Sequence, residues 1–370
     1  MDYEPYDYSP IVDREPIRWP SGARVAFYVG LNVEHYPVDR SGLSIAPHTV
    51  GLSPDPLNHG WRDYGPRVGI WRMMDCLDHL GLRASVMLNS DVCARYPRII
   101  EAGRARDWTW VAHGKDNSRY QADMEPDVEL AHVREIVDTI ERATGRRPRG
   151  WLGPALTETF HTPYVLAELG LDYVLDWAND DQPYWLNVPG MMSVPYPIEV
   201  NDITLFVGKS LSGPEFVRIV RDQLDQLHAE SAHSGRVMSL ALHPFVANQP
   251  FRQKYVAQAL EYVARHPGVW LTTTDEIATH YARHHAPGPT CPRVRRAAGQ
   301  GPERAGAGRV PAGPAAHARD RAGVLPSGTH PLPRGRRPAR QRCAHAGSPS
   351  GACGGPEPAV ATPVPCRWRT

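Results

Sequence analysis

Short β-rich runs alternate with helical stretches over the first 286 residues, and this order constrains the fold more than any other feature. The runs that we predict as strands cover residues 24–31, 83–88, 108–113, 149–153, 172–177, 203–208, 236–242 and 269–274. Helices are predicted over residues 68–82 and 125–145, with Gly81 and Gly145 as their C-terminal caps. Repeated strand-then-helix order gives parallel strands with right-handed crossovers, so we expect an α/β barrel of seven or eight units.

Composition changes abruptly near residue 287. The segment from Pro287 to Thr370 has 14 Arg, no Lys and 3 acidic residues, which leaves 27 basic and 37 acidic residues in 1–286. This segment has no Ile, Phe, Tyr or Met, so it cannot bury enough apolar surface to offset its ordering entropy. We therefore predict an N-terminal extension (1–23), a barrel (24–286) and a disordered, low-complexity Arg/Pro/Gly/Ala tail (287–370). A shifted reading frame in GC-rich coding DNA is our preferred explanation of the tail.

Removal of this tail gives a direct test. A chain that ends at Ala286 should keep the melting temperature and any activity of the full chain, because the tail has too few large apolar residues to build a core. Thermal unfolding of the two chains measures this. A drop of many degrees in the shortened chain would contradict the prediction, and an ordinary continuation in another frame of the coding DNA would support the frameshift.

The sequence also excludes several classes of protein. The N-terminus is acidic, aromatic and broken by proline, and no segment approaches the roughly 18 apolar residues of a membrane span. We expect a cytoplasmic protein with no membrane partner. The tail lacks Lys and interleaved aromatic residues, so we expect no nucleic-acid partner. No C-x-x-C pair occurs, and Cys76 and Cys93 are predicted to be reduced core residues.

Polar side chains follow most of the predicted strands at the point where each strand ends. In a parallel barrel these positions meet at one end, where reactive groups gather. The residues concerned are Asn32, Glu34, His35, Asn89, Ser90, Asp91, His113, Asp116, Asn117, Thr157, Glu158, Asn179, Asp180, Asp181 and His243. We therefore expect one end of the barrel to carry three histidines and several carboxylates.

Two of these stretches contain candidate metal or acid–base residues. Glu34 can act as a general base or a metal ligand, although it can also be a solvated loop carboxylate. His113 and Asn117 have the spacing of two ligands on one helical turn, but Asn117 offers only a weak amide oxygen. His243 ends a strand before Pro244, and a lone histidine in such a place is more often structural.

Other stretches suggest a place for substrate. Asp176, Asp180 and Asp181 lie in one loop with the aromatic residues Tyr184 and Trp185. These aromatic side chains can raise the carboxyl pKa values or receive a flat ligand, or the loop can simply be a turn rich in Asx residues. A second stretch precedes the first long helix and contains Trp61, Arg62, Tyr64 and Arg67. An arginine there can clamp a carboxylate or ureido group, or can pair with acidic residues of the barrel.

Taken together, these stretches resemble the polysaccharide deacetylase family (NodB homology domain, carbohydrate esterase family 4), and within it the allantoinase-like subgroup. The resemblance covers roughly residues 24–284. It rests on five stretches in the order of the family, namely LNVEHYP (31–37), AHGKDN (112–117), RGWLGP (149–154), NDDQPYW (179–185) and LALHPF (240–245).

The resemblance implies a distorted (β/α)₇ barrel that hydrolyses a carbon–nitrogen bond other than a peptide bond. It implies Glu34 as base or metal ligand, His113 as the first imidazole ligand, His243 as general acid and Asp180 or Asp181 as the partner of His243. It also places Trp151 in the substrate groove, and we add Trp61, Tyr64, Arg67 and Tyr184 as substrate-binding candidates. The metal-ligand candidates are Glu34, His35, His113 and Asn117.

Departures from the family pattern bear on the substrate and the metal. Asn117 stands where the family has a second histidine, and Asn32, Glu34 and His35 replace an aspartate pair. We therefore leave open whether the chemistry uses one divalent metal (Zn, Mn or Co) or none. We expect a cytosolic amidohydrolase for a small amide or ureide of allantoinase type. The alternatives are an N-deacetylase of a carbohydrate and an inactive ligand-binding barrel, and we leave homo-oligomerisation open.

Overall fold

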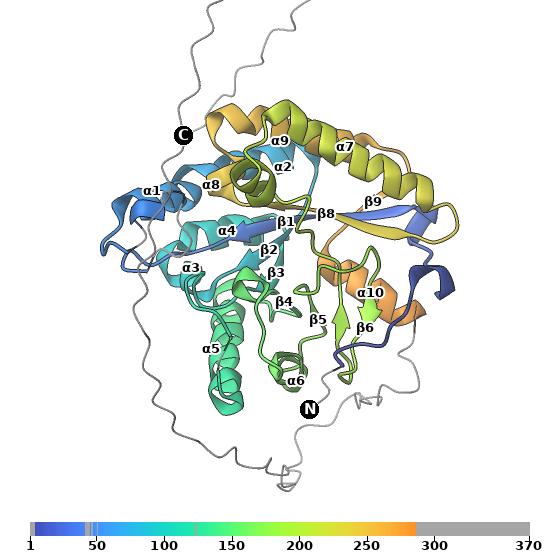
Figure 1. Cartoon of the computed structure of the whole chain (residues 1–370), viewed down its shortest axis with the longest axis horizontal. Coiled ribbons are helices and arrows are strands. Elements are labelled where there is room, and N and C mark those ends of the chain that lie inside the picture. The colour runs from blue at the N-terminus through green and yellow to red at the C-terminus, as the bar shows by residue number, and fades with distance from the viewer. Residues whose placement is uncertain (1–3, 41–44, 46, 50, 123, 286–370) are drawn as a thin grey trace, which may run out of the picture. The chain divides into compact units, whose positions relative to one another are not determined.

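A curved sheet with helices around it forms the body of the molecule (Figure 1). The computed structural model describes residues 4–40, 45, 47–49, 51–122 and 124–285, and the predicted tail lies outside them. The main path of the sheet runs β6-β7-β5-β4-β3-β2-β1-β8, and β9 also pairs with β1. All pairs are parallel except β6 with β7. The sheet is a half-barrel of the distorted (β/α) type, so the predicted fold class is confirmed.

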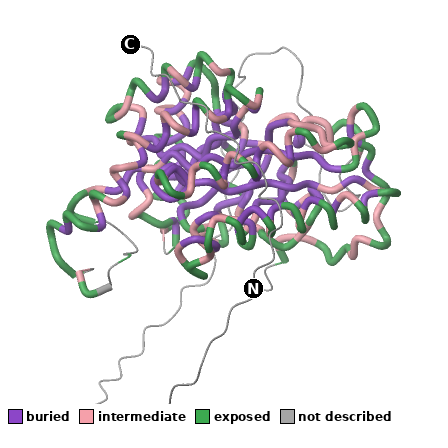
Figure 2. The backbone as a smooth tube through the Cα atoms, turned by 90° about the horizontal axis from the view of Figure 1, so that it is seen from above, coloured by how far each residue is buried: buried purple, intermediate pink, exposed green. Residues whose placement is uncertain are grey.

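The central strand β1 (Val25–Val33) is buried along its whole length, which is typical of a parallel strand covered on both faces. Its alternate residues divide between two apolar clusters. Phe27 and Leu31 belong to the cluster under the helices, whereas Ala26 and Tyr28 belong to the cluster inside the barrel. Figure 2 shows these buried segments in the centre of the molecule, with exposed segments around them.

The remaining strands differ greatly in length. Three match long predicted runs, namely β2 (Ala84–Leu88), β3 (Thr109–Ala112) and β8 (Arg236–Leu242). Shorter strands are β4 (Gly150–Trp151), β5 (Tyr173–Val174), β6 (Tyr184–Trp185), β7 (Met192–Ser193) and β9 (Val269–Leu271). β6 and β7 were not predicted, since two-residue pairs leave no periodic pattern in a sequence.

Ten α-helices surround the sheet in the described part of the chain. They are α1 (Pro56–Tyr64), α2 (Ile70–Leu80), α3 (Ser90–Arg95), α4 (Pro97–Ala105), α5 (Pro126–Thr144), α6 (Thr162–Glu168), α7 (Gly213–Glu230), α8 (Pro244–Ala247), α9 (Pro250–Arg265) and α10 (Thr274–His284). Gly81 and Gly145 end α2 and α5 with φ values of 64° and 75°, as predicted. No helix of these described residues is both long and apolar enough to cross a membrane.

The prediction of a strand over residues 203–208 is wrong. Residues Ile203–Gly208 form a π-helical segment, in which the Asn201 side chain accepts a hydrogen bond from the backbone N–H of Ile203 at 3.0 Å. Leu205 and Phe206 on this segment are buried in the core. A short apolar run has no period by which a buried helix can be distinguished from a buried strand.

Residues before the barrel pack against its edge. The Trp19 indole N–H donates to the carbonyl of Arg236 at 2.9 Å, and Gly235 N–H donates to the carbonyl of Ile17 at 2.9 Å. Trp19 and Ile17 are both buried. The cysteines Cys76 and Cys93 are free and half-buried against the core.

Candidate active site

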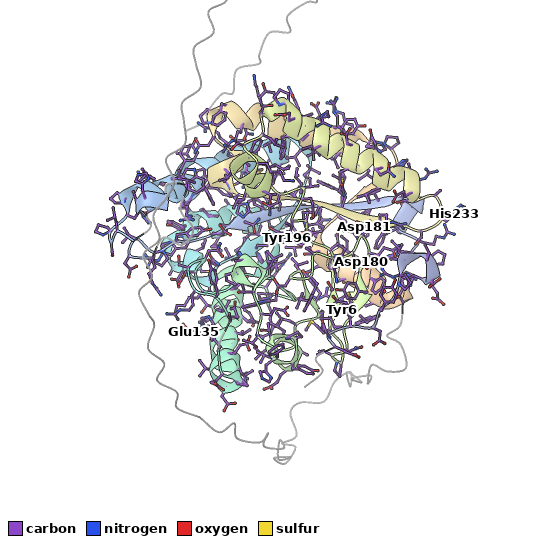
Figure 3. All side chains as sticks on the ribbon, in the orientation of Figure 1. Tyr6, Glu135, Asp180, Asp181, Tyr196 and His233 are labelled. Atoms are coloured by element: carbon purple, nitrogen blue, oxygen red, sulfur yellow. The ribbon has the colours of Figure 1, made fainter. Side chains whose placement is uncertain are left out.

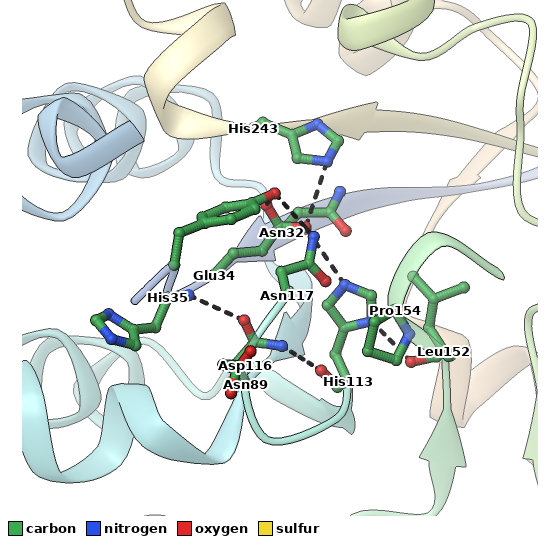
Figure 4. A network of polar contacts seen from close by, with 12 residues as sticks. Asn32, Glu34, His35, Asn89, His113, Asp116, Asn117, Leu152, Pro154 and His243 are labelled. Atoms are coloured by element: carbon green, nitrogen blue, oxygen red, sulfur yellow. Dashed lines mark hydrogen bonds and ion pairs between the residues drawn. The ribbon is translucent and has the colours of Figure 1, made fainter. Parts of the chain in front are cut away.

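Three of the predicted residues come together at the carboxyl ends of neighbouring strands. Glu34 follows β1, His113 follows β3 and His243 follows β8 (Figure 4). Glu34 Oε1 lies 3.3 Å from His113 Nε2 and 3.7 Å from His243 Nε2. All three side chains are at least nine-tenths buried. A carboxylate between two imidazoles, shielded from water, is a site that can hold and transfer protons.

Glu34 is held as a carboxylate by its neighbours. The Tyr36 hydroxyl donates to Oε2 at 2.8 Å, and the Asn117 amide donates to Oε1 at 2.8 Å and to the Tyr36 oxygen at 2.8 Å. Burial opposes ionisation of Glu34, but His243 and His113 outweigh burial and lower the pKa of this carboxyl. The same surroundings raise the pKa of Tyr36 well above its usual range, through burial first and then Glu34.

His243 is held by Asp202, which lies just before the π-helical segment. The ring Nδ1 lies 2.7 Å from Asp202 Oδ1, and the backbone N–H of His243 donates to Oδ2 at 2.7 Å. Burial favours the neutral ring, but Asp202 and then Glu34 outweigh it and raise the pKa of His243. Residue 201 forms a parallel bridge with Ala241 of β8, and this places Asp202 beside the end of that strand.

The prediction that Asp180 or Asp181 orients His243 is therefore wrong. Asp180 forms an ion pair with Arg14 at 2.6 Å, and burial raises the pKa of Asp181. After β5 the chain folds back toward the antiparallel pair β6 and β7. The carbonyl of Asp181 accepts from Val237 N–H near the start of β8, whereas His243 follows the end of that strand. Nothing in the sequence pattern distinguished these aspartates from Asp202.

A cavity of about 950 Å³ lies beside these two aspartates. Its wall includes Tyr6, Asp180, Asp181 and Tyr196, which are labelled in Figure 3, together with Arg14 and Tyr184. Glu34, His113 and His243 are not part of this wall. Tyr196 connects the two regions, because the Asn32 amide donates to its hydroxyl oxygen at 2.9 Å. The Glu34 cluster differs from this larger cavity in that it brings two imidazoles within 3.7 Å of one carboxylate oxygen.

His35 lies apart from Glu34, so the prediction that both are ligands of one metal is wrong. Consecutive residues of an extended chain point to opposite sides. The His35 ring is directed away from the cluster, and its Nδ1 lies 3.2 Å from the Tyr96 hydroxyl (Figure 4). The pKa of His35 is lowered to about 4, mainly by burial and secondly by the positive charge of Arg95.

The predicted substrate-binding residues lie in three separate places. Trp61 and Tyr64 are half-buried and Arg67 is exposed, on or next to α1, and Trp61 packs edge-on against Phe245 near His243. Tyr184 lines the larger cavity. Trp151 is 0 % exposed in the core, so its prediction as a groove residue is wrong.

Sequence reasoning missed two residues of the cluster. Tyr36, which contacts Glu34, is two residues further along the chain, and this spacing places both on one side of an extended segment. Asp202 precedes an apolar run that we predicted as a strand, so the prediction placed it at the wrong end of the sheet. The alternation around Glu34 could have identified Tyr36, but no local signal could have identified Asp202.

Comparison with known proteins agrees with the fold. The family model for polysaccharide deacetylase matches residues 62–174. A Schizosaccharomyces pombe protein provisionally named a polysaccharide deacetylase is 25% identical over 306 residues, covering 74% of this chain and 94% of its own. Two solved structures share the fold at 24% identity and a TM-score of 0.65. One is described as Puue allantoinase, and the match covers 75% of this chain and 99% of that chain. The other is a Pseudomonas aeruginosa protein provisionally named a polysaccharide deacetylase, and the match covers 74% of this chain and 96% of that chain.

The half-barrel has the fold of the NodB type, and a buried carboxylate lies between two imidazoles at the ends of its strands. Residues 62–174 match the model of the polysaccharide deacetylase family, whose members hydrolyse carbon–nitrogen bonds other than peptide bonds.

Many members of this family use a divalent metal, but the side chains around Glu34 are a poor set of donors for one. A catalytic zinc site commonly has three protein ligands. Here Glu34 and His113 are the residues that would hold a metal, His243 is bound to Asp202, and Asn117 directs an N–H donor at Glu34. In the part of the chain that the structure describes, no three His, Cys, Asp or Glu side chains are grouped to hold a metal ion.

Proposed function

We propose that this protein is a cytoplasmic amidohydrolase that opens a carbon–nitrogen bond in a small cyclic amide or ureide, as an allantoinase does. The observation that carries the proposal is Glu34 between His113 and His243, with an asparagine amide in the place of a second metal-binding histidine. The cluster contains both a base and an acid, Glu34 and His243, but it does not contain a full set of metal ligands among the described residues. The shared fold of the Puue allantoinase structure is compatible with this substrate class.

The residues divide the reaction into two proton transfers. Glu34, held as a carboxylate, takes a proton from water as the water oxygen attacks the carbonyl carbon. His243, held in its protonated form by Asp202, gives its proton to the departing nitrogen. His113 and neighbouring amide groups stabilise the negative charge on the tetrahedral oxygen.

The family model supports a second candidate, an N-deacetylase of a carbohydrate. The purified protein should be assayed on cyclic ureides, formamides and N-acetyl sugars, with and without added Zn²⁺, Mn²⁺ or Co²⁺, with Glu34→Gln as the blank. Proton release from a ureide supports our proposal. Acetate release from N-acetyl sugars replaces it with the deacetylase, and binding without turnover replaces it with an inactive barrel.

Replacing Asn117 by His tests the metal directly. The variant should bind Zn²⁺ at least about ten times more tightly than the wild type, because a second imidazole completes a set with Glu34 and His113. Isothermal titration calorimetry measures the affinity, and Asn179→His in an exposed loop is the matched control. If the wild type already binds one metal tightly and Asn117→His adds nothing, the donor set has been misjudged.

A further inference from the structure

A hydrogen-bonded chain leads from His113 to a carboxyl group that the proposed mechanism does not use. His113 Nδ1 lies 2.7 Å from the carbonyl oxygen of Leu152, and the next backbone N–H, that of Gly153, donates to Asp176 Oδ1 at 2.7 Å. The carbonyl and the N–H belong to one peptide group. Asp176 is therefore connected to His113 through a single peptide, and His113 Nε2 in turn faces Glu34 at 3.3 Å.

The direction of this chain follows from its donors and acceptors. A carbonyl oxygen only accepts, so His113 carries hydrogen on Nδ1 and presents Nε2 to Glu34. A carboxylate that accepts the N–H of a peptide polarises that peptide and makes its carbonyl oxygen a stronger acceptor. Negative charge on Asp176 therefore strengthens the bond that orients the His113 ring.

Glu158, rather than Asp176, is the member of this carboxyl pair that holds a proton. Both oxygens of Glu158 and Oδ2 of Asp176 are buried, and as two carboxylates they would have no donor among the described residues. Burial, then the Asp176 charge, raises the pKa of Glu158 well above its usual range, so Glu158 holds a proton at neutral pH. Burial also raises the pKa of Asp176, to about 7, although the hydrogen bonds from Glu158 and Gly153 limit that rise.

The turn that carries this peptide is sterically confined. A Cβ on Gly153 would meet the carbonyl oxygen of Thr157 at 2.2 Å, and one on Gly114, next to His113, would meet Pro154 at 2.4 Å. Ala155 and Leu156 have positive φ values of 55° and 57°, which non-glycine residues seldom adopt. Strained backbone of this kind persists only where surrounding structure holds it, and it gathers at functional sites.

We propose that Asp176 is a positioning residue for His113, acting through the Leu152–Gly153 peptide, and that Glu158 is its proton-bearing partner. The consequence for turnover rests on the function proposed above, whereas the effect on the His113 ring does not. Asp176 and Glu158 thus form a buried carboxyl pair that fixes one imidazole of the cluster, as Asp202 fixes the other.

The test compares charge with hydrogen bonding at one position. Asp176→Asn can still accept the Gly153 N–H but has no charge, Glu158→Gln mimics the protonated partner, and Asp181→Asn is a matched control far from His113. Proton and ¹⁵N spectra of histidine-labelled protein, assigned with His113→Asn, report the Nδ1–H resonance of His113. The Nδ1–H resonance of His113 should move upfield in Asp176→Asn. It should keep its wild-type position in Glu158→Gln and in Asp181→Asn. On a working substrate, Asp176→Asn should lower kcat about tenfold with little change in KM.

Two results would overturn the proposal. One is an unchanged Nδ1–H resonance in folded Asp176→Asn, and the other is an equal shift in Asp181→Asn. If Asp176→Asn does not fold, the test is made on the wild type. The proposal then requires that the Gly153 amide proton and the His113 Nδ1–H both resonate at low field and exchange slowly, and it fails if either does not. These spectra need no substrate, so a protein inactive on every compound would refute the proposed function and leave this inference to be judged separately.

Discussion

Glu34→Gln and His243→Ala should each lower kcat on the best substrate by roughly 10² to 10⁴, the usual contribution of general acid–base catalysis. Glutamine keeps the size of Glu34 but cannot take a proton from water, and alanine removes the group that protonates the leaving nitrogen. Steady-state kinetics measures both effects. The double variant should lose far less than the product of the two, because the residues act as a unit.

His35→Gln is the matched control for these variants, since the His35 ring is buried nearby but directed away from Glu34. Circular dichroism and melting must accompany the kinetics to show that each variant folds. A folded Glu34→Gln or His243→Ala that retains more than about a tenth of wild-type kcat would refute the assigned roles.

The pH profile follows from the same two groups. Activity needs Glu34 ionised and His243 protonated. The pKa of Glu34 lies below its ordinary value of 4.5, so the base persists as pH falls through 4.5, and that of His243 lies above 6.5, so the acid persists as pH rises through 6.5. The profile of kcat/KM should therefore be a broad bell whose limbs lie outside these two values. A single limb centred between them would contradict the assignment.

Asp202→Asn should lower kcat nearly as much as Glu34→Gln or His243→Ala, by at least roughly 10². An amide in that place can present N–H to the ring and impose the wrong tautomer on His243. The alkaline limb of the pH profile should move to lower pH, since the charge that raises the pKa of His243 is lost. Kinetics over a range of pH measures both effects.

Asp180→Asn and Asp181→Asn are the matched controls, because these aspartates line the larger cavity rather than contact His243. Both should leave the pH profile of kcat unchanged. A loss in either control as large as that in Asp202→Asn would restore the assignment suggested by the family resemblance.

The sequence by itself determined the features that depend on local pattern. The buried run of β1, the glycines that end α2 and α5, and the alternation of strands and helices predict a parallel barrel. In a barrel of parallel strands, the residues that follow the strands all lie at the same end of the barrel. That single geometric rule correctly predicted that Glu34, His113 and His243 lie together.

Only the tertiary structure decided which side chains pair across that end. Asp202 reaches His243 because residue 201 pairs with β8, some forty positions along the chain, and the competing Asp180 is drawn away by a two-residue strand pair and by Arg14. Trp151, which the family resemblance places in a substrate groove, is buried by its neighbours. Local sequence encodes the period of a strand or helix, whereas a contact between distant side chains depends on the path of every intervening loop, which has no period from which it can be predicted.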